Sequence, residues 1–196
     1  MSTGKGIAAW LASSCQPRSS LFITSKVLNG IDAEGGIAAA CRRSLANLGL
    51  DYVDLYLIHA PFKQSGEPFT QSLSDLWKDM ETLVADGLVK SIGVSNFRVC
   101  DIQAVLATAS IPPAINQVER HPCLPQENLF YKCTLGGITM AAYGSLCPLT
   151  KPDVVARVGA MATGIAAAHG AQVTAGMVLL AWNMQAGVVT LTTVIT

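Results

Sequence analysis

The chain has 196 residues, of which 51% are hydrophobic and only 13% are charged, and its 13 basic and 13 acidic residues cancel. No basic cluster is present, so we expect neither nucleic acid nor an anionic membrane surface as a partner. No apolar run is long enough to span a bilayer, and the first residues lack a signal-peptide layout, which together predict a cytoplasmic protein. The length suits one domain with a sizeable core, so we expect residues 1–196 to form a single domain.

Short apolar segments alternate with helical patterns along almost the whole chain. Strands are predicted at residues 21–27, 53–59, 91–96, 115–119, 138–144 and 187–194. Apolar stripes between them predict a helix starting near Gly4, helices over 37–48, 73–84 and 99–106, and two helices over 153–185 that are broken near Gly170. Mostly apolar strands are typical of parallel sheets covered on both faces. The alternation predicts an α/β architecture and leaves a barrel and an open doubly wound sheet as alternatives.

The cysteines are scattered, at positions 15, 41, 100, 123, 133 and 147, with no Cys-x-x-Cys pair. This spacing predicts free thiols in a reducing compartment. It favours neither a disulfide framework nor a metal site.

Two basic residues stand at the ends of the first two apolar strands. Lys26 ends the first strand and His59 ends the second. In a parallel barrel the carboxyl ends of the strands share one face, where active sites are built, so these side chains would converge there. The structural alternatives are a surface lysine and a satisfied buried histidine. His121 is interpreted as a loop residue beside a strand end.

Polar or aromatic residues also end or line the following strands. Ser95 and Asn96 close the third strand, where they fit either a helix N-cap or a pair of groups that bind a ligand amide. Gln117 lies in the fourth strand, where an inward polar side chain needs a partner. Tyr143 ends the fifth strand and fits either a stacking surface for a flat ring or the core. Together these residues indicate a binding site at one end of the strands.

Four segments together closely resemble the aldo-keto reductase family: residues 21–26, 48–59, 87–97 and 116–122. Their order and spacing also match that family. The resemblance implies a TIM-type (β/α)8 barrel that transfers a hydride from NADPH to an aldehyde or ketone, a small-molecule carbonyl substrate.

The resemblance also implies roles for individual residues. Lys26 corresponds to the family's catalytic lysine and His59 to its catalytic histidine. Ser95, Asn96 and Gln117 correspond to residues that hold the nicotinamide amide, and Tyr143 to the aromatic residue that stacks on the nicotinamide ring. In the family, the general acid is a tyrosine whose high pKa is lowered by the lysine.

The resemblance implies an incomplete barrel of about six of the eight strands. The family's first two strands, with its catalytic aspartate and tyrosine, precede the helix that starts here near Gly4, and its phosphate-binding C-terminal segment follows the last predicted strand. Gly144 and Cys147 stand where the family's cofactor loop usually has serine and glycine.

These departures predict little or no reductase activity for this chain alone. The alternatives are a non-catalytic relative that binds a cofactor or partner, and a non-functional fragment. Outer strands with exposed apolar edges would also favour self-association.

Overall fold

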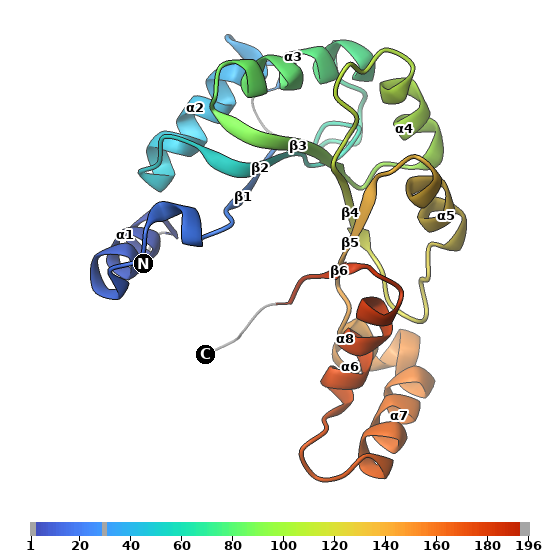
Figure 1. Ribbon diagram of the computed structural model, residues 1–196. Coiled ribbons are helices and arrows are strands. Elements are labelled where there is room, and N and C mark those ends of the chain that lie inside the picture. Colours follow the sequence, from blue (N-terminus) through green and yellow to red (C-terminus); the bar gives the residue numbers. More distant parts are fainter. Residues whose placement is uncertain (1–2, 29–30, 193–196) are drawn as a thin grey trace. The chain divides into compact units, whose positions relative to one another are not determined.

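The computed structural model describes residues 3–28 and 31–192, and the chain divides into two compact units, Met1–Ala114 (unit 1) and Ile115–Thr196 (unit 2). Strands and helices alternate in both units (Figure 1). We predicted a single domain from the length of the chain. The division into two compact units does not test that prediction, so it stays a prediction. Within the described ranges, no helix is both long and apolar enough to cross a membrane.

Unit 1 is a parallel sheet with helices packed on it. Its elements are α1 (Thr3–Ser14), the 3-10 helix η1 (Arg18–Ser20), β1 (Thr24–Val27), α2 (Gly36–Leu48), β2 (Val53–Ile58), α3 (Leu73–Ala85), β3 (Val89–Ser95) and α4 (Val99–Leu106). Strand β2 pairs in parallel with β1 on one side and with β3 on the other. Figure 1 shows α2 and α3 along one face of these strands.

The register of β1, β2 and β3 separates two kinds of side chain. Lys26 is opposite Leu57, and Leu57 is opposite Gly93. Because side chains alternate along a strand, this row and its neighbours two residues away point to one face of the sheet. The other face carries Tyr56, which is fully buried and opposite Ile92. The helix side of the sheet therefore carries Tyr56 and Ile92, and Lys26 lies on the opposite side with the buried Leu57.

Helix α3 forms because its apolar residues recur at helical spacing. Its N-cap, Ser72, accepts a hydrogen bond from the Asp75 backbone N–H (3.1 Å), which satisfies one of the free amides of the first turn. The buried stripe consists of Leu76, Trp77, Met80 and Leu83, all fully inaccessible to solvent. The Trp77 indole N–H donates to the Ile111 carbonyl oxygen at 2.8 Å, so the largest core side chain leaves no polar atom unsatisfied.

A buried carboxylate fixes the amino end of the sheet in unit 1. Asp54 in β2 accepts hydrogen bonds from the Ile23 N–H (2.9 Å) and the Arg18 guanidinium (2.8 Å), and Lys90 lies 3.3 Å away. Burial acts to raise the pKa of Asp54, but these hydrogen bonds outweigh it and lower that pKa. The contact with Ile23 also explains why β1 begins at Thr24 rather than at residue 21. The Ile23 N–H is used by a side chain instead of a neighbouring strand.

Unit 2 contains β4 (Ile115–Glu119), α5 (Glu127–Leu135), β5 (Thr139–Tyr143), α6 (Cys147–Thr150), α7 (Pro152–Ala168), α8 (Ala175–Gln185) and β6 (Val189–Thr190). Strand β5 pairs in parallel with both β4 and β6. The break predicted near Gly170 separates α7 from α8, and this glycine has φ of +98°, which favours a residue without a side chain. Of the last predicted strand, residues 193 and 194 lie outside the described residues.

Helix α8 is attached to unit 2 by a buried polar network. The guanidinium of Arg120, which is only 5% exposed, donates to the Asn183 side-chain oxygen and lies 4.3 Å from the centre of the Trp182 ring. The Asn183 amide nitrogen donates to the Arg120 carbonyl oxygen (3.2 Å) and to the Ser145 hydroxyl (3.0 Å). Asn183 of α8 therefore anchors two segments: the one that follows β4, through Arg120, and the one that follows β5, through Ser145.

Candidate active site

Unit 1 brings together the site residues predicted at the ends of its strands. Lys26 lies on β1, His59 directly follows β2, and Ser95 is the last residue of β3. The register places all three side chains in rows that point to the same face. Lys26 and His59 are close enough for the lysine charge to lower the histidine pKa.

Asn96 joins the ends of two neighbouring strands. Its backbone has φ of +60°, in the left-handed region that asparagine tolerates better than most residues. Its side-chain amide donates to the His59 carbonyl oxygen at 2.8 Å and to the Ser95 hydroxyl at 3.2 Å. Ser95 is fully buried. The conformation of Asn96 therefore fixes its own amide and the Ser95 hydroxyl beside His59.

The basic groups of this cluster are shifted toward their neutral forms. Burial lowers the pKa of Lys26. Burial, and then the charge of Lys26, lower the pKa of His59. The shift favours the neutral His59 imidazole, a form that can donate one hydrogen bond and accept another.

The tyrosines of unit 1 lie apart from this cluster. Tyr56 faces the helix side of the sheet, and burial raises its pKa to about 12. The Tyr52 ring contacts Arg18 (4.4 Å) and Lys90 (4.2 Å) near the amino end of β2. Within the described part of unit 1, neither tyrosine shares the face of Lys26 and His59.

Unit 2 places its two predicted site residues on one face of its strands. Gln117 is opposite Ala141, and Glu119 is opposite Tyr143, so these rows point the same way. Gln117 is buried, and Tyr143 is half-buried. Burial, and then the negative charge of Glu119, raise the pKa of Tyr143.

A pocket of about 460 Å³ opens at the carboxyl ends of β5 and β6. It is lined by Tyr143, Gly144, Ser145, Leu146, Cys147, Thr150, Leu191 and Thr192. The Ser145 hydroxyl is held by Asn183 of α8, so part of the pocket wall is fixed by the buried network. This cavity of unit 2 contains one predicted site residue, Tyr143.

The segment after β5 makes a contact that the sequence analysis missed. Gly144 has φ of +65°, and a Cβ added there would lie 3.1 Å from Glu119 Cγ and 3.3 Å from Cys147 Sγ. The Cys147 thiol donates to Glu119 Oε1 at 3.4 Å. In the sequence, the only signal was that Gly144 and Cys147 differ from the residues usual in the family. The structure shows that these two residues bring the Cys147 thiol to the Glu119 carboxylate.

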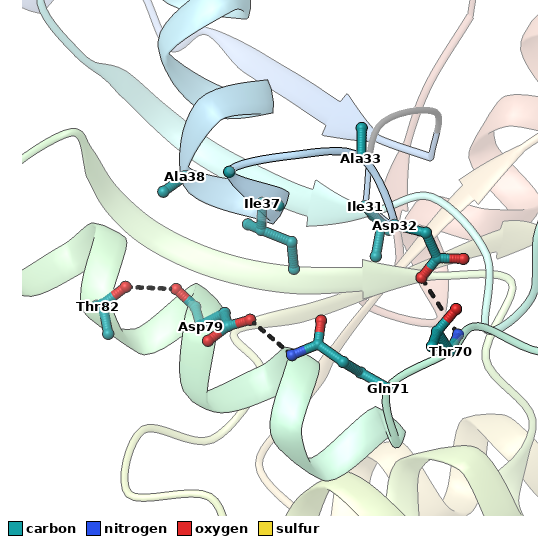
Figure 2. A pocket seen from close by; sticks show the side chains of 11 residues that line it. Ile31, Asp32, Ala33, Ile37, Ala38, Thr70, Gln71, Asp79 and Thr82 are labelled. Atoms are coloured by element: carbon teal, nitrogen blue, oxygen red, sulfur yellow. Dashed lines mark hydrogen bonds between the residues drawn. The ribbon is translucent and has the colours of Figure 1, made fainter.

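A pocket of about 440 Å³ lies in unit 1 beside the start of α2 (Figure 2). Asp32 accepts from the Thr70 N–H (3.2 Å) and from Lys63 (2.8 Å), and Gln71 donates to Asp79 (3.3 Å). Polar side chains that line this pocket are thus already hydrogen-bonded or ion-paired to neighbouring residues. None of the predicted site residues lines this pocket, so it is not the candidate active site.

Comparison with known proteins matches residues 4–148 to the model of the aldo/keto reductase family. The chain is 40% identical over 182 residues to an NAD/NADP-dependent indole-3-acetaldehyde reductase of Schizosaccharomyces pombe, covering 90% of this chain and 60% of that protein. It is 38% identical over 187 residues to a glyoxal reductase of Bacillus subtilis, covering 95% of this chain and 63% of that protein. The chain thus spans roughly three fifths of the length of these curated relatives.

Solved structures show the same relationship. An aldo-keto reductase of Bombyx mori, in complex with NADP, superimposes with a TM-score of 0.83 at 31% identity, covering 97% of this chain and 64% of that one. The predicted α/β architecture, a part of a (β/α)8 barrel, is therefore confirmed. On the match to the family model and on these identities, the chain belongs to the aldo/keto reductase family.

Proposed function

We propose that this protein is an NADP(H)-dependent oxidoreductase that reduces the carbonyl group of aldehydes or ketones. The observation that carries the proposal is the cluster of Lys26, His59 and Ser95 on one face, at the carboxyl ends of three adjacent parallel strands, with Asn96 hydrogen-bonded to the last two. Parallel barrels build their active sites at this end. Both named relatives act on aldehydes, which makes aldehydes the first substrates to test.

The residues present fit a nicotinamide cofactor. In unit 1, the Ser95 hydroxyl and the Asn96 amide are oriented by their own hydrogen bond and match the donors and acceptors of a carboxamide. In unit 2, taken by itself, we propose that Gln117 binds a nicotinamide amide and that the Tyr143 ring provides an aromatic surface for a flat ring. When bound, this cofactor supplies the hydride.

The basic pair would act on the oxygen of the substrate. We propose that the neutral His59 imidazole donates a hydrogen bond to the carbonyl oxygen and orients it. The positive charge of Lys26 would stabilise the negative charge that develops on this oxygen during hydride addition.

A second candidate function is cofactor binding with weak turnover. The supporting observation is that, in the described part of unit 1, Tyr52 and Tyr56 are not on the face of Lys26 and His59. The proton for the product alcohol would then lack the tyrosine that supplies it in the family. Loss of a general acid typically removes roughly 10²–10⁴ of rate. We therefore propose that the 196-residue chain by itself turns over slowly.

Aldehyde-dependent oxidation of NADPH by the purified chain separates the two candidates. We expect a rate at least about 100-fold below that of the Bacillus subtilis glyoxal reductase assayed beside it. The residual rate should fall further in Lys26→Met and persist in Lys78→Met, whose lysine is exposed and paired with Asp75. A rate equal to that of the relative would contradict weak turnover, and equal rates in both variants would contradict the role of Lys26.

A further inference from the structure

We propose that Glu119, His121 and Cys147 form a binding site for a divalent transition-metal ion, with Zn²⁺ as the ion that fits best. All three residues belong to unit 2 and are described in the structure. Each offers one ligand atom, and these atoms lie within 4.8 Å of one another. The proposal does not depend on reductase activity.

The separations of the ligand atoms are close to those of a tetrahedral zinc site. Glu119 Oε1 lies 3.5 Å from His121 Nε2 and 3.4 Å from Cys147 Sγ. Bonds of about 2.3 Å to sulfur and about 2.0–2.2 Å to nitrogen and oxygen, at tetrahedral angles, place ligand atoms about 3.3–3.6 Å apart. Two of the ligand–ligand distances therefore already match those of a tetrahedral zinc site.

In the described part of unit 2, the His121 imidazole is buried and held only by a long contact to Glu119. Its side chain is only 8% exposed, and its Nδ1 atom has no hydrogen-bond partner within the described residues. Its Nε2 atom faces Glu119 at 3.5 Å, which is the outer limit of a hydrogen bond. Buried imidazoles are normally held by good hydrogen bonds. A metal ion bound to Nε2 would replace this long contact with a coordination bond, whereas Nδ1 takes no part in the proposed site.

The backbone holds the three ligands in place. His121 and Leu124 exchange backbone hydrogen bonds of 3.3 and 2.8 Å, which fixes the turn that carries the imidazole. The Cys147 N–H donates to the Gly144 carbonyl oxygen at 2.9 Å, which fixes the turn that carries the thiol. Gly144 itself leaves the space through which thiol and carboxylate meet, because a Cβ would approach both closely. Little rearrangement is therefore needed to bind an ion.

The donor set selects the class of metal. A thiolate, an imidazole and a carboxylate are all ligands of Zn²⁺, whereas Ca²⁺ and Mg²⁺ prefer oxygen alone. On binding, the Cys147 S–H bond breaks, a sulfur–metal bond forms, and the proton is released to the buffer, with no change of oxidation state. The three protein ligands leave a fourth position to water. Cys147 also lines the pocket with Tyr143, so the ion would lie at the wall of that pocket.

The test is titration of the chelator-treated, reduced chain with Zn²⁺ by calorimetry, and with Co²⁺ by absorption. We expect one ion per chain and a thiolate-to-cobalt charge-transfer band. Because loss of an outer-shell partner alone costs about 10–100-fold, Cys147→Ser should weaken Zn²⁺ binding by at least about 100-fold and abolish the band. The control is Cys100→Ser, an exposed cysteine of unit 1, which should leave both unchanged.

Three results would overturn the proposal: no Zn²⁺ binding below millimolar concentration, binding that Cys147→Ser leaves intact, or a loss that is equal in Cys100→Ser. Circular dichroism of each variant shows whether it is folded. The cobalt band of the unmodified chain provides a test even if Cys147→Ser does not fold, because its absence alone contradicts thiolate coordination.

Discussion

Lys26 and His59 illustrate how a residue's chemistry depends on its place in the fold. Both are basic, both are partly withdrawn from water, and the charge of Lys26 acts on His59. The result is a histidine and a lysine that both have lowered pKa values, at the end of the strands where parallel barrels build their active sites. Their order along the chain predicted this pair, because parallel strands bring their carboxyl ends together.

The lowered pKa of His59 makes the stability of unit 1 dependent on pH. The folded chain binds a proton at His59 less tightly than the unfolded chain, whose histidine has a pKa near 6.5. The free energy of unfolding should therefore rise with pH through the window just below about 6.5. Below the folded pKa of His59, the full loss of stability from protonating this histidine is present. His59→Gln should flatten this rise in urea unfolding between pH 5 and 8. An unchanged slope in the variant would contradict the shift.

Asp54 should also make stability rise with pH, but in a more acidic range. Its lowered pKa means that its contribution is present above about pH 4 and is lost as the pH falls through the folded pKa. At pH 7, Asp54→Asn should cost about 2 kcal/mol, because it weakens the charge-assisted hydrogen bonds from Arg18 and Ile23. The exposed Asp51→Asn is the matched control in denaturant unfolding. Equal stability of the two variants would show that Asp54 contributes nothing through its charge.

At the level of elements, periodicity predicted most of the fold. The stripe of α3 and the helices over 37–48 and 99–106 were correctly placed, because apolar residues recur at helical spacing and are buried in the structure. Strand β4 has the predicted bounds. The contact of Glu119 with Cys147 could not be predicted, since it joins residues 28 positions apart through the turn at Gly144. The hydrogen bonds between Arg120 and Asn183 were also not predicted, because these residues are 63 positions apart in the sequence.

The attachment of α3 can be tested at Trp77. This side chain is fully buried and donates a hydrogen bond to the Ile111 carbonyl oxygen. Trp77→Ala should lower the free energy of unfolding by about 3–5 kcal/mol, because it leaves a cavity and an unsatisfied acceptor. Trp10→Ala in α1, where the tryptophan is 40% exposed, should cost much less. Denaturant unfolding followed by circular dichroism measures both, and similar losses would contradict the packing described for α3.

For the whole molecule, the family is established by the match over residues 4–148 and by identities near 40%. The roles of the candidate site residues, the cytoplasmic location and self-association through the outer strands stay predictions. The strand pattern could indicate where these residues gather, but only the family resemblance assigned them roles, since each of them also has a structural interpretation. The chain spans roughly three fifths of its curated relatives, so its own ability to bind the cofactor is the central question.

A fluorescence titration of the purified 196-residue chain with NADPH tests this account most directly. We predict saturable binding that weakens about 10-fold in Tyr143→Ala, which removes the proposed stacking surface, and is unchanged in Tyr131→Ala, whose side chain is exposed on α5. The absence of saturable binding to a folded sample, or equal affinities in the two variants, would contradict the proposed cofactor site.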